Sequence, residues 1–124
     1  MNHKRPVNLD LGSLKFPPMA IVSILHRISG LVLFLMFPFM LYLLSLSLHS
    51  ETTFMQMQMI LANPYSKVLL WVFSCALAYH LLAGIRHLIM DVGFGESLAA
   101  GKRSAVSIIA LALLSFIFLG FWIW

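Results

Sequence analysis

Charged side chains are scarce in this chain of 124 residues: they make up 10% of it, against 61% hydrophobic residues, and the mean hydropathy is +0.97. This balance excludes a water-soluble domain, which needs far more polar surface. Acidic residues are the rarest charges, with four carboxylates against eight lysines and arginines. A single cysteine, Cys75, excludes an internal disulfide, and we expect it only to pack inside a helix.

Alternation of polar and apolar residues with a period of two is also missing, which excludes a membrane β-barrel of useful size. Three long, nearly uncharged runs are present instead, at residues 28–48, 68–85 and 104–124. Each has about 18 to 21 residues, enough helix to cross the ~30 Å hydrocarbon core of a bilayer. The sequence therefore predicts an all-α integral membrane protein with three transmembrane helices.

We expect a single membrane-anchor domain over residues 1–124, with no repeats and no soluble domain. Its expected parts are a polar arm (1–18), a first helix (about 19–48), a loop (49–64), a second helix (about 65–91), a loop (92–103) and a third helix (about 104–124). The first run is too long for a signal-peptide core, so we expect it to be retained. The first loop, rich in Thr, Met and Gln, is long enough to hold a short interfacial helix.

The eight basic residues are distributed unevenly between the two sides of the membrane. Seven precede the first span or flank the second loop, and Lys67 alone falls on the opposite side. This asymmetry predicts a cytoplasmic N-terminus and a C-terminus on the other side. Basic residues keep these segments on the cytoplasmic side and attract anionic lipid headgroups. These two effects explain the net charge of +4, so the charge does not indicate a nucleic-acid partner.

His80 is the most informative residue, because it lies inside the uncharged run 68–85. An imidazole at that depth in hydrocarbon is costly and indicates a functional site. It shares one helical face with Gly84, His87 and Asp91, at spacings of four, seven and eleven residues. Haem iron is the best occupant for it, and Gly84 is expected to leave room for a flat macrocycle.

A second polar face is expected on the first helix, where Ser23, Arg27 and Gly30 are spaced by four and seven residues, with His26 beside them. The two faces could meet. Ser23 and Arg27 would lie near the cytoplasmic interface, and His80 deeper. A haem would then have its iron at His80 and its charged edge near His26, Arg27 and His87.

Other interpretations of these residues stay open. His80 could hydrogen-bond a neighbouring helix or belong to a proton relay. Arg27 and Arg86 could be interfacial anchors that snorkel to the headgroups, and Ser23 could bond its own helix. A copper site at Met55, Met57 and Met59 is disfavoured, because spacing by two splays the sulfur atoms around a helix.

Two motifs resemble a known family, the cytochrome b membrane-anchor subunit of succinate dehydrogenase, complex II. The first is Ser-Ile-Leu-His-Arg-Ile-Ser-Gly at 23–30, preceded by Arg5-Pro6, and the second is His-Leu-Leu-Ala-Gly-Ile-Arg-His at 80–87, followed by Asp91 and Gly93. The resemblance runs from about Arg5 to Arg103. It implies a multi-pass protein of the bacterial cytoplasmic (inner) membrane.

The resemblance also implies roles for individual residues. His80 would be one axial ligand of haem b, with the other histidine supplied by a second small anchor subunit of the complex. Ser23 and Arg27 would bind ubiquinone through a hydroxyl and a guanidinium, with Phe16 and Ile24 as apolar lining. His26, Arg27 and His87 would approach the haem propionates.

The implied function is to pass electrons from succinate oxidation into the quinone pool. Succinate would be oxidised at FAD in a flavoprotein subunit, and electrons would cross iron–sulfur clusters in a further partner, so this chain does no succinate chemistry itself. Three rivals remain: a cofactor-free anchor or assembly subunit, a quinol:fumarate reductase anchor, and a quinol-oxidising cytochrome without soluble partners.

Overall fold

The structure, a computed structural model, describes residues 16–124 and is helical throughout that range apart from short connections. It has four helices: α1 (Pro18–His49), α2 (Glu51–Ala62), α3 (Pro64–Asp91) and α4 (Leu98–Ile123). Three of them, α1, α3 and α4, are long and apolar enough to cross a membrane. The prediction of an all-α protein with three membrane spans is confirmed. Arg5-Pro6 and most of the predicted polar arm lie outside the described residues.

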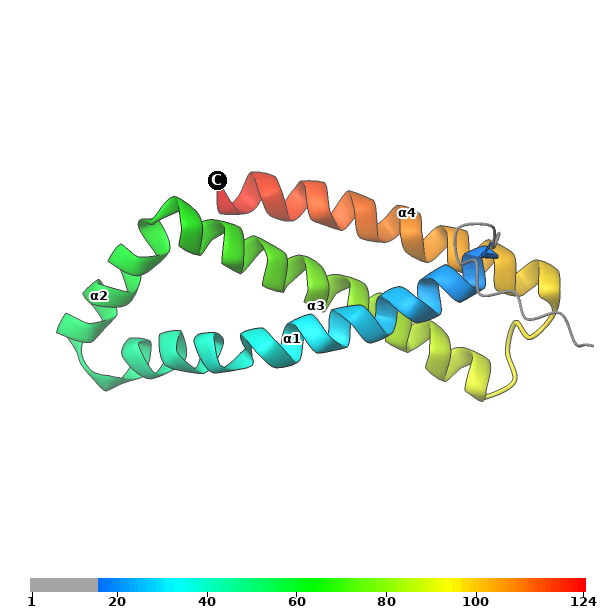
Figure 1. Cartoon of the computed structure of the whole chain (residues 1–124), viewed down its shortest axis with the longest axis horizontal. Helices are drawn as coiled ribbons and strands as arrows, with labels where there is room; N and C mark the ends of the chain where they lie inside the picture. Colours follow the sequence, from blue (N-terminus) through cyan, green and yellow to red (C-terminus); the bar gives the residue numbers. More distant parts are fainter. Residues whose placement is uncertain (1–15) are drawn as a thin grey trace, which may run out of the picture.

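The three long helices run side by side in an up-down-up arrangement (Figure 1). α2 joins α1 to α3 at one end of the bundle, and the loop between α3 and α4 lies at the other end, where α1 begins. The start of α1 and the C-terminus are therefore at opposite ends of the bundle. This is the arrangement that an odd number of spans requires.

Prolines and small polar residues set where the helices begin. Pro18 and Pro64 occupy the first turns of α1 and α3, where a missing N–H costs nothing. The Asn63 side chain accepts a hydrogen bond from the Tyr65 amide at 2.9 Å, and Ser97 accepts one from the Ala100 amide at 3.3 Å. These signals are local, so the helix starts follow from the sequence.

The segment 49–64, predicted as a loop with room for a short helix, is almost entirely helical. Ser50 is extended and ends α1, and its hydroxyl accepts a bond from the Thr53 amide at 3.2 Å. The Thr53 hydroxyl in turn accepts from the Ser50 amide at 3.0 Å, which completes a capping box. α2 therefore starts two residues after α1 ends, with Ser50 alone between them.

The second loop is shorter than the range 92–103 expected from the sequence, because α4 begins at Leu98. The chain turns through Gly93 and Gly95, which adopt φ values of 91° and 75°. L-residues with a side chain avoid these values, so glycine permits the tight reversal. Lys102 and Arg103 thus belong to the first turns of α4 rather than to a loop.

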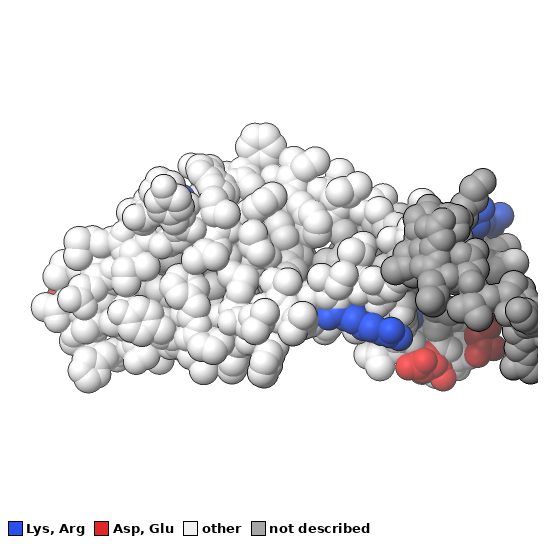
Figure 2. Space-filling view, in the orientation of Figure 1, with Lys and Arg blue, Asp and Glu red and all other residues white. Residues whose placement is uncertain are grey.

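The core between the helices is small and made largely of small residues. Its buried members are Val22, Tyr79, Ala83, Ala105 and Ala112. Small side chains allow transmembrane helices to approach closely, and van der Waals packing then holds them together. Most large apolar side chains lie on the outside, as lipid or partner helices require. The visible face in Figure 2 is almost uncharged except at the end where α1 begins.

Candidate functional site

His80 lies on α3 and its imidazole meets α1 through one nitrogen. Nδ1 is 3.0 Å from the Ser29 hydroxyl and 3.1 Å from the main-chain carbonyl of His26. The Ser29 hydroxyl also donates to the same His26 carbonyl at 2.8 Å. Ser29 is only 7% exposed, so these three polar groups satisfy one another inside the helix interface.

This network specifies the proton on His80. The His26 carbonyl can only accept, so Nδ1 must carry a proton to bond it. A deprotonated Nδ1 would face the carbonyl oxygen lone pair at 3.1 Å, which is repulsive. The neutral imidazole therefore has its proton on Nδ1 and a free lone pair on Nε2. Among the hydrogen bonds within residues 16–124, none uses Nε2 of His80.

The His26 ring covers one face of the His80 ring. Their centroids are 4.1 Å apart with an interplanar angle of 14°, and His87 follows, 5.2 Å from His26 with a tilt of 55°. α1 and α3 thus meet through polar side chains that bring three histidines together, His26, His80 and His87. Within this part of the chain, no three histidine, cysteine or acidic side chains are arranged as a complete metal-ligand set.

Two glycines give the histidines their space. A Cβ on Gly30 would lie 3.1 Å from Cε1 of His80, which is tighter than ordinary contact. A Cβ on Gly84 would lie 3.4 Å from Nε2 of His26. The His26 ring therefore lies in ordinary contact with the Gly84 position, and room for a macrocycle beside Gly84 stays a prediction.

The four residues expected at the quinone lie on or just before the first turns of α1. Phe16 is 47% and Ile24 42% exposed, Arg27 is exposed and Ser23 is partly buried. From the sequence, Ser23 and Arg27 are expected to share a face with Gly30 that points toward the second membrane helix. In the structure His26 and Ser29 make the polar contacts with His80, and Arg27 is turned about 100° away from His26.

The sequence did not indicate that three further residues would link the helices. Besides Ser29, the Tyr79 hydroxyl donates to the Val22 carbonyl at 2.9 Å and joins α3 to α1. A buried tyrosine needs such a partner, but nothing in the sequence says which carbonyl it will meet. One feature of the sequence could have indicated Ser29: it lies three residues after His26 and therefore on the same helical face.

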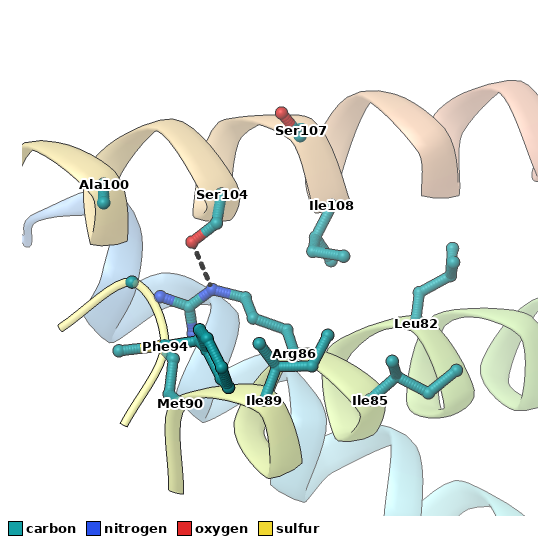
Figure 3. A pocket seen from close by; sticks show the side chains of 11 residues that line it. Leu82, Ile85, Arg86, Ile89, Met90, Phe94, Ala100, Ser104, Ser107 and Ile108 are labelled. Carbon is teal, nitrogen blue, oxygen red and sulfur yellow. Dashed lines mark hydrogen bonds between the residues drawn. The ribbon is translucent and has the colours of Figure 1, made fainter. Parts of the chain in front are cut away.

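Arg86 is the third such residue, and its interpretation as a snorkelling anchor is wrong. The side chain is 6% exposed and points from α3 toward α4 (Figure 3). Nε donates to the Ser104 hydroxyl at 2.9 Å, and the guanidinium also donates to the Gly101 carbonyl at 3.2 Å. Arg86 and Ser104 border a largely apolar cavity of about 450 Å³, whose other lining includes Leu82, Ile85, Ile89 and Phe94.

Comparison with known proteins matches residues 1–119 to the family described as succinate dehydrogenase/fumarate reductase transmembrane subunit. The succinate dehydrogenase cytochrome b556 subunit of Coxiella burnetii is 49% identical, with all of both chains covered. The cytochrome b556 subunits of Rickettsia typhi and Paracoccus denitrificans are each 32% identical. The alignments cover 90% of this chain and 87% of the Rickettsia chain, and 86% of this chain and 82% of the Paracoccus chain.

With its three spans, the chain is a multi-pass protein of the inner membrane, and the resemblance expected from the two motifs is confirmed. The chain belongs to the family of transmembrane subunits of succinate dehydrogenase and fumarate reductase.

Proposed function

We propose that this chain is the haem b-binding membrane anchor of a succinate:quinone oxidoreductase and forms part of its ubiquinone-reduction site. Family membership supplies the coarse part, a membrane subunit of an oxidoreductase complex. The proposed residue roles go further: His80 is an axial ligand of the haem iron, and Ser23 and Arg27 contact the quinone.

The observation that carries the haem proposal is the way α1 holds His80. Bonds to Nδ1 from one side leave Nε2 with a lone pair, the form in which histidine binds a metal. Such a hydrogen bond on the other ring nitrogen accompanies nearly all histidine ligands. The relatives named cytochrome b556 subunit support haem as the group that His80 binds.

A second axial ligand would come from the second small anchor subunit of the complex. His26 is stacked on His80, with the two ring centroids 4.1 Å apart. Two rings in van der Waals contact leave no space for a macrocycle between them, so His26 cannot complete the coordination. His26 and His87 suit the propionate side instead, because imidazoles can donate hydrogen bonds to carboxylates.

The quinone proposal rests on the exposed residues at the start of α1. Arg27 presents a guanidinium one turn after the partly buried Ser23 hydroxyl, and Phe16 and Ile24 add exposed apolar surface. A hydroxyl can donate to a quinone carbonyl, and a guanidinium stabilises negative charge on the reduced head group. Because this face is open, partner chains would complete the pocket.

In the proposed complex, the partner subunits supply the electrons that reach the quinone. Succinate is oxidised at FAD in the flavoprotein subunit, electrons cross the clusters of the iron–sulfur subunit, and the quinone receives two electrons and two protons. When bound by two histidines, haem b supplies one-electron storage with no open coordination position. This chain's residues hold the quinone and orient His80.

Difference spectra of reduced minus oxidised membranes test the haem proposal. The chain is co-expressed with its companion subunits, and His80→Ala is compared with His49→Ala, an exposed histidine at the far end of α1. We expect the b-type bands to disappear in His80→Ala and to persist in the control. Bands of unchanged height in an assembled His80→Ala complex contradict the proposal.

Succinate-driven quinone reduction tests the second site. Ser23→Ala and Arg27→Ala are each expected to lower quinone reduction by roughly tenfold or more, the effect of losing a charge-assisted or specific hydrogen bond. Reduction of a soluble dye by succinate should stay unchanged, because it bypasses the quinone. Ser45→Ala and Arg103→Ala, both at exposed positions, are matched controls. Full quinone activity in both site variants rejects the site.

A further inference from the structure

We propose that Ser29 is a positioning residue for the haem, and that its hydroxyl, together with the His26 carbonyl, sets the balance between ferric and ferrous iron. The inference rests on the proposed role of His80 as a ligand and adds a residue to which the two sequence motifs assigned no function. It concerns groups of this chain alone: a hydroxyl, a carbonyl and an imidazole across the α1–α3 interface.

The direction of the Ser29 hydrogen bonds follows from their geometry. A hydroxyl has one proton, and the 2.8 Å contact with the His26 carbonyl takes it, since a carbonyl cannot donate. A lone pair of the hydroxyl oxygen is then left to face Nδ1 of His80, 3.0 Å away. Ser29 therefore accepts the Nδ1 proton and shares it with the His26 carbonyl at 3.1 Å.

The site is built tightly enough for this bond to persist. Ser29 is only 7% exposed, so water cannot easily replace His80 as its partner. His80 is confined as well, by the stacked His26 ring at 4.1 Å and by the backbone of Gly30, where even a Cβ would come within 3.1 Å of the imidazole. One segment of α1, residues 26–30, thus fixes the tautomer and the plane of the ring.

An acceptor on Nδ1–H raises the electron density of the imidazole and makes Nε2 a stronger donor to iron. Stronger donation stabilises ferric more than ferrous iron, which lowers the reduction potential. Removal of the Ser29 hydroxyl leaves the His26 carbonyl as the only acceptor. The haem potential should therefore move in the positive direction, while iron stays bound through His80.

Redox titration of the haem in the purified complex with all its subunits tests this inference. In Ser29→Ala, the ratio of ferric to ferrous haem at a fixed potential should fall about fivefold, the factor typical of one hydrogen bond. Ser47→Ala is the matched control: Ser47 is also on α1 and donates to the carbonyl three residues earlier at 2.7 Å. Ser29→Thr keeps a hydroxyl and should restore most of the potential.

The electron paramagnetic resonance spectrum of the ferric haem gives a second reading, because it responds to the donor strength and ring plane of the axial imidazole. We expect a changed spectrum in Ser29→Ala and an unchanged one in Ser47→Ala. If Ser29→Ala does not assemble, Ser29→Cys replaces the hydroxyl by a weaker acceptor and should shift the potential in the same direction.

The outcomes separate this inference from the function on which it rests. A potential and spectrum equal to those of the unmodified complex, or a shift in the negative direction, overturns the role of Ser29 while His80 remains the ligand. Haem bands that survive in His80→Ala overturn the proposed ligand itself. That second result is obtained without any Ser29 variant.

Discussion

Individual polar side chains connect the helices. Apolar packing alone would allow each helix several rotations about its own axis. Arg86 is the strongest example, since its guanidinium is almost fully buried and bonds a hydroxyl and a carbonyl of α4. A buried charge without partners would be costly, so these bonds specify how α3 and α4 meet. Ser29 and Tyr79 do the same between α3 and α1.

Replacement of Arg86 by methionine should lower the free energy of unfolding by about 1 to 3 kcal/mol, the usual range for lost hydrogen bonds to a charged group. Methionine keeps much of the stem but cannot donate to Ser104 or Gly101. Unfolding in mixed micelles with increasing denaturing detergent measures the change. Arg103→Met, at an exposed position on α4, is the control, and equal stability of the two variants would refute the role of Arg86.

At the scale of elements, the distance between α1 and α3 is set where Gly30 passes His80. The imidazole cannot retreat freely, because two acceptors hold Nδ1 and the His26 ring covers one face. A packed interface tolerates added atoms poorly when the neighbouring group is fixed. This contrasts with Gly120, where an added Cβ would meet Trp71 Nε1 at an ordinary 3.6 Å.

Gly30→Ala should therefore destabilise the bundle by roughly 1 to 3 kcal/mol and reduce the haem recovered per complex, since the new methyl group displaces the His80 ring. Gly120→Ala should change neither quantity appreciably. Haem content by absorbance, normalised to flavin, and detergent unfolding provide the two measurements. Normal haem content in Gly30→Ala would show that the ring has more freedom than the 3.1 Å contact allows.

For the whole molecule, the up-down-up bundle separates two unlike ends (Figure 1). The loop after α3 and the start of α4 share one end with the start of α1, while α2 and the C-terminus lie at the other. Basic residues flank the first of these ends, and in the membrane such segments remain cytoplasmic. The predicted orientation places Ser23 and Arg27 on the cytoplasmic side.

Reporter fusions test this orientation. Alkaline phosphatase fused after Trp124 should be active, because it folds only outside the cytoplasm, and a fluorescent protein fused there should be dark. The same reporters fused after Ser97 should give the reverse pattern. Phosphatase activity after Ser97 combined with fluorescence after Trp124 would show that the chain is inserted in the opposite direction.

The differences between sequence and structure have physical causes. α2 fills most of a segment predicted as a loop with room for a short helix, because the reciprocal Ser50–Thr53 cap starts a new helix directly after the break at Ser50. α4 begins at Leu98, ahead of its hydrophobic run, because Gly93 and Gly95 complete the reversal within a few residues. Both depend on local geometry that a hydropathy pattern does not resolve.

The sequence by itself determined the three spans, the family and the histidine around which the proposed site is built. The free energy of transferring a segment into lipid is approximately a sum over its residues, so the spans can be found from the sequence alone. Only the tertiary structure decided that His26 and Ser29, rather than Ser23 and Arg27, meet His80. Neighbouring helix positions differ by about 100°, and close packing of small side chains from all three long helices selects the rotation that no single segment specifies.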